Sequence, residues 1–348
     1  MKFGIFSHVA WPEGDTVKKA YDDKVEQVLA AEKWGFYSSW LAEHHFTRYG
    51  AISSLPQFLT YLAAKTDRIR LGTAVSVLPV HDPILLAEQF ATLDVLSDGR
   101  LDVGIGRGFS PAEDAVFGID REITSRLYLE SVDVIRGLWT TPEFSFNGEF
   151  HHLENVTLVP QPVQKPHPPL YMAAFQTSTN VEAAADRQLP IIVGIILDHD
   201  AAAGWFQEYQ KMASTKGFSP DVSEWPLQRP IFVAETEEEA REIPREGVRW
   251  MWEMIDFISH NKHLSDIHQD FQGWRKNNPS GVSYEEFLEK KAIFGTSETV
   301  VAKIRWLRDT HNIHHLIGDF SAGALDQEQV LKSMDLFASK VMPQLSLI

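Results

Sequence analysis

A repeated alternation of short apolar segments with longer, helically spaced segments constrains this sequence most. The apolar segments lie at residues 3–6, 37–42, 68–78, 101–105, 170–174, 190–197, 230–234 and 315–318. Segments with helical spacing follow them, as at 22–35, 84–96 and 327–341. Strands joined by helices run parallel with right-handed crossovers. Eight such units predict an α/β fold, a closed (β/α)8 barrel of the TIM type. An open doubly wound sheet is disfavoured, because no Gly-x-Gly-x-x-Gly follows the first strand.

Two segments interrupt this alternation. Residues 140–168, after the fourth helix, are rich in proline and aromatic residues and contain Asn147-Gly148, which predicts an inserted hairpin and loop. Residues 259–292, before the last barrel unit, are polar and irregular. Loops of that length are disordered or functional, so we expect a mobile lid over the barrel mouth, the alternative being a solvated excursion without a role. No linker is evident, and residues 1–348 are expected to form one domain.

Composition excludes several classes of protein. The 48 acidic residues outnumber the 32 basic ones, and the net charge of −16 argues against partners that are nucleic acids or anionic membranes. The chain has no cysteine, which excludes disulfides, thiolate metal sites and cysteine nucleophiles. The start of the chain does not look like a signal peptide, and no apolar run reaches the ~20 residues of a membrane span. We therefore expect a cytoplasmic protein.

An arginine between two glycines ends the fourth predicted strand. Gly106 and Gly108 allow the backbone to approach a ligand, and Arg107 offers a planar fork suited to phosphate. The alternative is a tight turn with a solvated arginine. Residues 177–179, Thr-Ser-Thr, stand where the helix after the fifth strand should begin, and free amides at a helix N-terminus hold anions. The two features together predict a two-sided phosphate clamp.

The second predicted strand ends in Glu43-His44-His45. Because the two histidines are adjacent, only one can face the barrel mouth. The functional interpretation is a neutral imidazole acting as a base or hydrogen-bond donor near pH 7, and the alternative is a hydrogen-bonded core histidine. No third ligand stands at a suitable spacing, so we expect no metal site. Ser7-His8 and Asp319-Phe320 end other strands and should converge on the same mouth.

Several motifs occur in an order that resembles a known family nearly end to end. They lie at residues 40–46, 72–79, 97–108, 116–118 and 333–343. In this order the chain resembles bacterial luciferase and its relatives, the luciferase-like flavin-dependent monooxygenases, and most of all the luciferase alpha-type subunits. The resemblance implies a barrel that binds reduced FMN (FMNH2) supplied by a separate flavin reductase. Oxygen adds to the flavin, and the peroxyflavin oxidises a small organic substrate such as an aldehyde or ketone.

The resemblance also implies site residues. His44 matches the active-site histidine, and Arg107 and Arg126 match arginines on the FMN phosphate. The peptide bond between Ala74 and Val75 matches a non-prolyl cis peptide against the flavin ring. The implied cofactor-binding residues are Ala74, Val75, Arg107, Arg126, Ala174, Phe175, Gln176, Ser178 and Thr179.

Two departures and two alternatives stay open. Gly106 stands where luciferases carry a reactive cysteine, and Phe175-Gln176 replaces acidic and hydroxyl residues; light emission and a long-chain aldehyde are therefore not implied. One alternative is a deazaflavin-dependent oxidoreductase that transfers hydride on the same barrel. The other is a catalytically silent partner subunit. The family likeness also suggests a homodimer.

Overall fold

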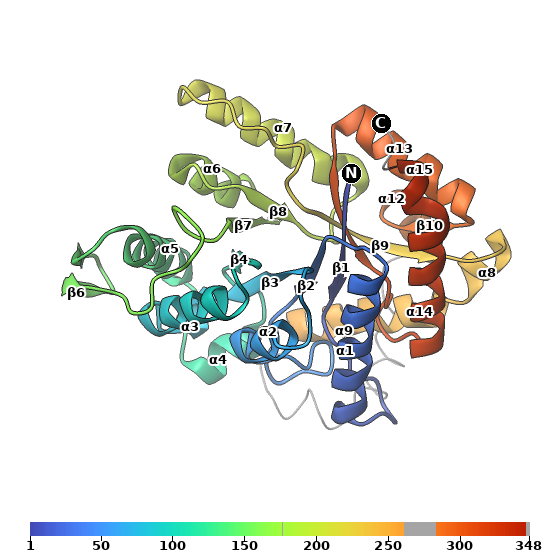
Figure 1. The fold of residues 1–348 in the computed structure, drawn as a ribbon, viewed down its shortest axis with the longest axis horizontal. Coiled ribbons are helices and arrows are strands. Elements are labelled where there is room, and N and C mark those ends of the chain that lie inside the picture. Colours follow the sequence, from blue (N-terminus) through green and yellow to red (C-terminus); the bar gives the residue numbers. More distant parts are fainter. Residues whose placement is uncertain (176, 261–282, 346–348) are drawn as a thin grey trace.

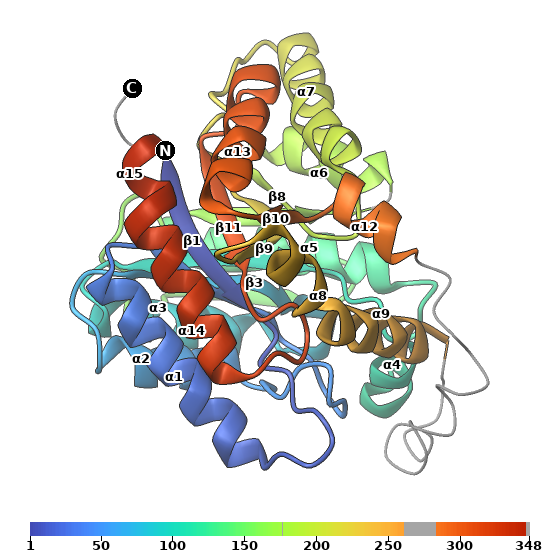
Figure 2. The ribbon, with the colours of Figure 1, turned by 90° about the vertical axis from the view of Figure 1, so that its right-hand side faces the viewer.

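The computed structural model describes residues 1–175, 177–260 and 283–345. Eight parallel strands close into a barrel surrounded by helices (Figures 1 and 2). Its strands are β1 (Lys2–Ser7), β2 (Ser38–Leu41), β3 (Arg70–Val77), β4 (Leu101–Gly106), β7 (Leu170–Ala174), β8 (Ile191–Val193), β9 (Leu227–Val233) and β11 (His315–Asp319). Pairing of β1 with both β2 and β11, and of Val193 in β8 with Leu227 in β9, completes the circle. The predicted (β/α)8 barrel is confirmed.

Helices cover the outside of the barrel. The main ones are α1 (Val17–Lys33), α2 (Leu55–Ala63), α3 (Pro83–Leu96), α5 (Thr124–Thr140), α6 (Ser178–Arg187), α7 (His199–Thr215), α8 (Glu237–Glu242), α9 (Arg245–His260), α13 (Ser297–His311) and α14 (Gln327–Leu336). Shorter ones are η1 (Leu78–Val80), α4 (Pro111–Phe117), α12 (Tyr284–Lys290), η2 (Phe337–Val341) and α15 (Met342–Leu345). Helix α1 begins earlier than predicted because Thr16 caps it, accepting a hydrogen bond from the Lys19 amide.

A single tryptophan fills the middle of the barrel. Trp40 is fully buried and packs in a cluster whose members come from strands on opposite sides of the barrel. A Cβ atom on Gly72 would lie 2.3 Å from the Trp40 ring, and one on Gly4 would lie 2.4 Å from Ser38 Oγ. Neighbouring strands therefore need glycine at these positions to make room for the indole and its surroundings.

The two insertions differ in outcome. Residues 140–168 contain the predicted hairpin, with β5 (Phe144–Asn147) antiparallel to β6 (His152–Val156). In the second insertion the irregular prediction is wrong in part, because α9 continues to His260, α12 follows at Tyr284, and strand β10 (Ile293–Gly295) pairs with β9. The remainder of the expected lid, 261–282, lies outside the described residues and stays a prediction.

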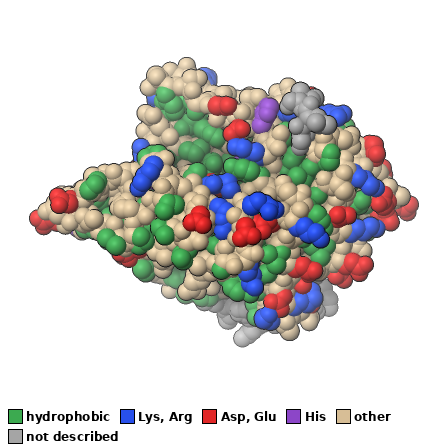
Figure 3. Space-filling view, in the orientation of Figure 1, with side chains coloured by type: hydrophobic (Ala, Val, Ile, Leu, Met, Phe, Trp, Pro, Cys, Tyr) green, Lys and Arg blue, Asp and Glu red, His purple; other side chains and the backbone are tan. Residues whose placement is uncertain are grey.

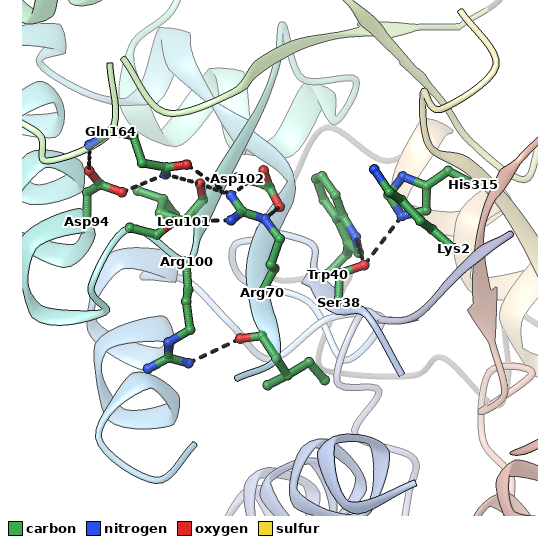
Figure 4. A network of polar contacts seen from close by, with 12 residues as sticks. Lys2, Ser38, Trp40, Arg70, Asp94, Arg100, Leu101, Asp102, Gln164 and His315 are labelled. Atoms are coloured by element: carbon green, nitrogen blue, oxygen red, sulfur yellow. Dashed lines mark hydrogen bonds and ion pairs between the residues drawn. The ribbon is translucent and has the colours of Figure 1, made fainter. Parts of the chain in front are cut away.

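The N-terminal end of the barrel holds a polar network in which the charged groups are hydrogen-bonded (Figure 4). Arg70 donates two hydrogen bonds to the Asp102 carboxylate, at 2.8 and 2.9 Å, and others to the Gly99 and Leu101 carbonyls and to Gln164. Each guanidinium nitrogen of Arg70 therefore donates a hydrogen bond to another group of the protein. A cavity of about 440 Å³ opens beside this network.

Basic and acidic side chains are intermingled near the middle of the face seen in Figure 3. None of the described helices combines the length and apolarity needed to cross a membrane.

Candidate active site

The C-terminal ends of the barrel strands bring the candidate residues to one mouth. β1, β2 and β11 are neighbours, so His8, His44 and Asp319, which end them or follow them closely, lie close together. Helix α9 packs against this end. Its Trp250 and Met254 belong to the same buried cluster as Tyr49 of the segment after β2. Apolar side chains of α9 therefore pack beside the segment that follows β2.

The imidazole ring of His44 belongs to a buried residue, with 8% of its surface exposed. Its ring packs edge-on against Tyr49, with centroids 4.8 Å apart, and lies 6.0 Å from the rings of His8 and Phe109. No hydrogen bond from the described residues reaches the ring. Burial lowers the pKa of His44 to about 4; the Glu43 charge opposes this and the His45 charge adds to it. At neutral pH His44 is thus uncharged, and its role in catalysis stays a prediction.

His45 turns away and joins a second cluster. Its Nε2 lies 2.8 Å from Glu43 Oε1, the same oxygen that lies 2.6 Å from His81 Nε2, and Ser76 Oγ donates to Glu43 Oε2 at 2.8 Å. Burial on its own raises the pKa of Glu43, but the hydrogen bonds from the two histidines outweigh it and bring the pKa down to about 2. Glu43 is therefore a buried carboxylate that stays ionised.

Hydrogen bonds join Glu43 to the peptide segment that the resemblance places against the flavin ring. The peptide bond between Ala74 and Val75 is cis, as the resemblance implied. The Glu43 amide donates to the Val75 carbonyl at 3.3 Å, and Glu43 Oε2 accepts from the Val77 amide at 3.3 Å. Through its amide and its carboxylate, Glu43 thus fastens the segment after β2 to the last residues of β3.

The expectation that no third ligand stands near Glu43 and the histidines is wrong. Ligand atoms of Glu43, His45 and His81 all lie within 4.8 Å of one another. Sequence reasoning missed His81 because only the pairing of β2 with β3 brings it there; its place soon after a strand end was the available signal. Both Glu43 oxygens already accept hydrogen bonds, so the geometry is that of a hydrogen-bonded cluster. Glu113 on α4 was missed too; it accepts a hydrogen bond from the His45 amide at 2.9 Å, and burial raises its pKa to about 7.

The two sides of the expected phosphate clamp follow neighbouring strands. Arg107 follows β4, and Ser178 and Thr179 begin α6 after β7, which pairs with β4. Arg107 is exposed and donates to Ser125 Oγ at 2.8 Å. Thr177, the N-cap of α6, is extended, and its side chain makes no capping bond to the described residues. The first amides of α6 are thus left for an outside acceptor, which suits a phosphate.

Other predicted cofactor residues have different surroundings. Arg126 on α5 pairs with Glu149 of the hairpin turn, with both nitrogen–oxygen distances 3.0 Å. Ala174 is buried at the end of β7, and the Phe175 carbonyl accepts from Trp205 Nε1 at 2.8 Å. Gln176 lies outside the described residues. A cofactor contact by Arg126 requires the Glu149 pair to open and stays a prediction.

Residues 1–311 match the model of the luciferase-like monooxygenase family, and the chain belongs to that family. Three curated relatives illustrate its range. An uncharacterized Sinorhizobium fredii protein, y4wF, is 36% identical over 173 residues, so the matched stretch spans half of each chain. The oxygenase component of a flavin-dependent trigonelline monooxygenase from Acinetobacter baylyi is 30% identical over 69% of this chain and 67% of its own. The alkanal monooxygenase alpha chain of Photorhabdus luminescens is 28% identical over 99% and 96%.

Solved structures agree on the fold. The monooxygenase RslO1 from Streptomyces bottropensis superposes with a TM-score of 0.85 at 28% identity, covering 99% of this chain and 100% of that one. An F420-dependent secondary alcohol dehydrogenase has a TM-score of 0.75 at 20% identity, covering 98% of each chain. The barrel is therefore shared by a monooxygenase and by an F420-dependent dehydrogenase.

Proposed function

We propose that the protein is the oxygenase component of a two-component monooxygenase, using FMNH2 from a separate flavin reductase and molecular oxygen to oxidise a small organic substrate. The observation that supports the proposal most is the placement of an exposed Arg107 after β4 and of an α6 start without a side-chain cap after the neighbouring strand β7, at the same end of the barrel as His44. The names of the relatives support it, since one is the oxygenase component of a flavin-dependent monooxygenase and another an alkanal monooxygenase. A homodimer is part of the same proposal.

The residues present fit FMN. Arg107 and the first amides of α6 would hold its phosphate, and Ala74 and Val75 would lie against its ring system. Val75 and Gly106 leave little room between them, since a Cβ on Gly106 would lie 2.4 Å from a Val75 methyl. Reduced flavin, when bound, supplies the electrons that activate oxygen.

The chain's own residues supply proton transfer and shelter. His44, neutral at pH 7, can take a proton from a reacting group on one ring nitrogen and return it later. Glu43 stays ionised and holds the Val75 peptide and His45 in place. Apolar side chains of helix α9 pack beside Tyr49 and would help to keep water from the reaction.

The test is an anaerobic titration of the protein with FMNH2 and with reduced F420, followed by addition of oxygen and mass spectrometry of products from a panel of aldehydes, ketones and aromatic compounds. We expect tighter binding of FMNH2 and incorporation of one oxygen atom into a substrate. Preferential binding of reduced F420 with no oxygen uptake would instead establish a hydride-transferring oxidoreductase. Binding of neither would overturn both.

A further inference from the structure

Three buried polar side chains lie directly behind His44 and outside the predicted site. His8 follows β1, Tyr49 lies in the segment after β2, and Asp319 ends β11; their exposures are 6%, 5% and 0%. Tyr49 Oη lies 2.7 Å from His8 Nε2, and His8 Nδ1 lies 3.8 Å from Asp319 Oδ2. Tyrosine, histidine and aspartate thus form one connected row, whose order resembles that of a hydroxyl–imidazole–carboxylate triad.

The Tyr49–His8 hydrogen bond can run in either direction, and the Asp319 carboxylate beside His8 Nδ1 favours the one in which Tyr49 donates. Burial raises the pKa of Tyr49 well above its usual value, so its hydroxyl keeps its proton and can donate to His8 Nε2. Burial, with the His44 and Lys24 charges, lowers the pKa of His8 well below its usual value, so its ring is neutral. A neutral imidazole that accepts at Nε2 carries its proton on Nδ1, and that proton points toward Asp319.

One of the two carboxylate oxygens of Asp319 lacks a hydrogen-bond partner among the described residues. Its Oδ1 accepts a hydrogen bond from the Ser321 amide at 3.0 Å, whereas its buried Oδ2 has no hydrogen-bond partner among the described residues. At 3.8 Å the His8 Nδ1–H is too far for a full hydrogen bond, but it is the donor that faces Oδ2. A buried acceptor without a partner costs stability, and such groups persist where they serve chemistry.

The row reaches His44 through Tyr49. The Tyr49 ring packs against His8, with centroids 4.4 Å apart, and edge-on against His44 at 4.8 Å. On another side, a Cβ on Gly50 would lie 2.6 Å from His44 Cδ2 and 2.9 Å from the His8 carbonyl. The His44 ring is therefore seated closely against Tyr49 and Gly50, and a shift of Tyr49 would move it.

The charged and titratable groups that face His8 are few. Asp319 comes from β11, His44 and Tyr49 from the segment after β2, and Lys24 from α1. The edge of the Phe6 ring closes the remaining side, with centroids 4.7 Å apart. His8 and His44 lower each other's affinity for a proton, so a proton on one favours the neutral form of the other.

We propose that Asp319, His8 and Tyr49 are positioning residues for His44. Asp319 selects the Nδ1–H tautomer of His8, His8 accepts the Tyr49 hydroxyl at Nε2, and the Tyr49 ring holds the His44 imidazole at the barrel mouth. Only the consequence for turnover rests on the proposed function; the tautomer and the seating of His44 are properties of the chain alone.

The first experiment uses the cofactor-free protein with 15N-labelled histidine and NMR. In the parent protein at pH 7 we expect His8 protonated on Nδ1. Asp319→Asn and Tyr49→Phe should each turn His8 into a mixture of tautomers and shift the titration of His44. Tyr128→Phe is the matched control, because it removes a hydroxyl from an equally buried tyrosine that donates to the Ile105 carbonyl at 3.3 Å. An Nε2–H tautomer in the parent, or variants that titrate like the control, would overturn the proposal.

The second experiment measures product formed per FMNH2 oxidised. Tyr49→Phe should lower this yield on the order of tenfold, through misplacement of a proton-transfer group, while FMNH2 affinity stays within about twofold. Asp319→Glu, which keeps the carboxylate, should recover part of the yield that Asp319→Asn loses. Equal losses in the two Asp319 variants would point to a packing defect and count against the proposal. Absence of any oxygenation by the parent protein would refute the proposed function and leave the NMR result standing.

Discussion

The two ends of the barrel treat buried polar groups differently. At the N-terminal end the guanidinium of Arg70 is held by Asp102, two carbonyls and Gln164, so its hydrogen-bonding capacity is met (Figure 4). At the C-terminal end, Asp319 Oδ2 and the ring of His44 lack hydrogen-bond partners among the described residues. Paired groups stabilise a fold, whereas unpaired buried groups cost stability. This difference supports the proposed function, in which the C-terminal end carries the chemistry.

Two buried histidines, one at each end of the barrel, show this contrast for the same residue type. His315 at the N-terminal end and His44 at the mouth are both buried, and burial lowers the pKa of each to about 4. His315 Nε2 lies 3.4 Å from Ser38 Oγ, and its Nδ1 lies 3.1 Å from the Glu224 carbonyl. No described residue bonds the ring of His44. The same residue type is thus a structural link in one place and an available proton acceptor in the other.

Removal of Arg70 should have the largest effect, and on stability alone. Arg70→Ala leaves Asp102 buried without its partner, and breaking such a pair costs about 3–5 kcal/mol. Chemical denaturation measures the loss. In protein that remains folded, FMNH2 affinity should be unchanged. A loss of affinity with normal stability would contradict the division between the two ends.

His44→Ala should affect product formation more than stability. Product per flavin oxidised should fall on the order of 100-fold, because a proton-transfer group is lost, and hydrogen peroxide should rise. FMNH2 affinity should stay near normal, and the free energy of unfolding should fall only by the lost packing of the ring against Tyr49 and Gly50, since no described residue forms a hydrogen bond with it. An unchanged product yield would remove His44 from the mechanism.

Arg107→Ala should weaken FMNH2 binding by roughly tenfold to a hundredfold, the ~1.5–3 kcal/mol of a charge-assisted hydrogen bond. Arg126→Ala is the matched variant: Arg126 already pairs with Glu149, so its loss should change affinity less. Both side chains are exposed, so stability should hardly change. Equal affinity of the parent protein for FMN and phosphate-free riboflavin would exclude the clamp.

A further expected effect is on the pH dependence of stability. For His44 and His315, the unfolded chain takes up a proton near pH 6.5 and the folded chain only near pH 4. Their stabilisation is therefore complete above pH 6.5 and is lost as pH falls toward 4, at up to about 1.4 kcal/mol per pH unit for each histidine. Denaturation from pH 8 to 4.5 measures this.

Substitution of each histidine should distinguish the roles of His44 and His315 in stability. His44→Gln and His315→Gln should each flatten the acid loss of stability. Only His315→Gln should also destabilise the protein at pH 8, by about 1 kcal/mol, because it disturbs hydrogen bonds to Ser38 and Glu224. Equal losses at pH 8 would show that His44, too, is a structural link.

The local sequence pattern was enough to predict the elements with a strong hydrophobic periodicity. The eight barrel strands and the hairpin around Asn147 were predictable, because alternating apolar positions and turn residues act within a few residues of one another. Strand β10 and helices α4 and α12 were missed. They are three to seven residues long, too short for a period to register, and their stability comes from neighbours they meet only in the folded chain.

The sequence by itself determined the barrel, the strand ends that meet at its mouth, and His44 and Arg107 as candidates there. Only the tertiary structure decided which side chains they meet. His81 reaches Glu43 because β2 pairs with β3, His8 and Asp319 approach His44 because β11 closes onto β1, and Arg126 is engaged by Glu149 because the hairpin folds back onto α5. These contacts join residues far apart in the chain. Their distances follow from strand register and barrel closure, which no local pattern of residues encodes.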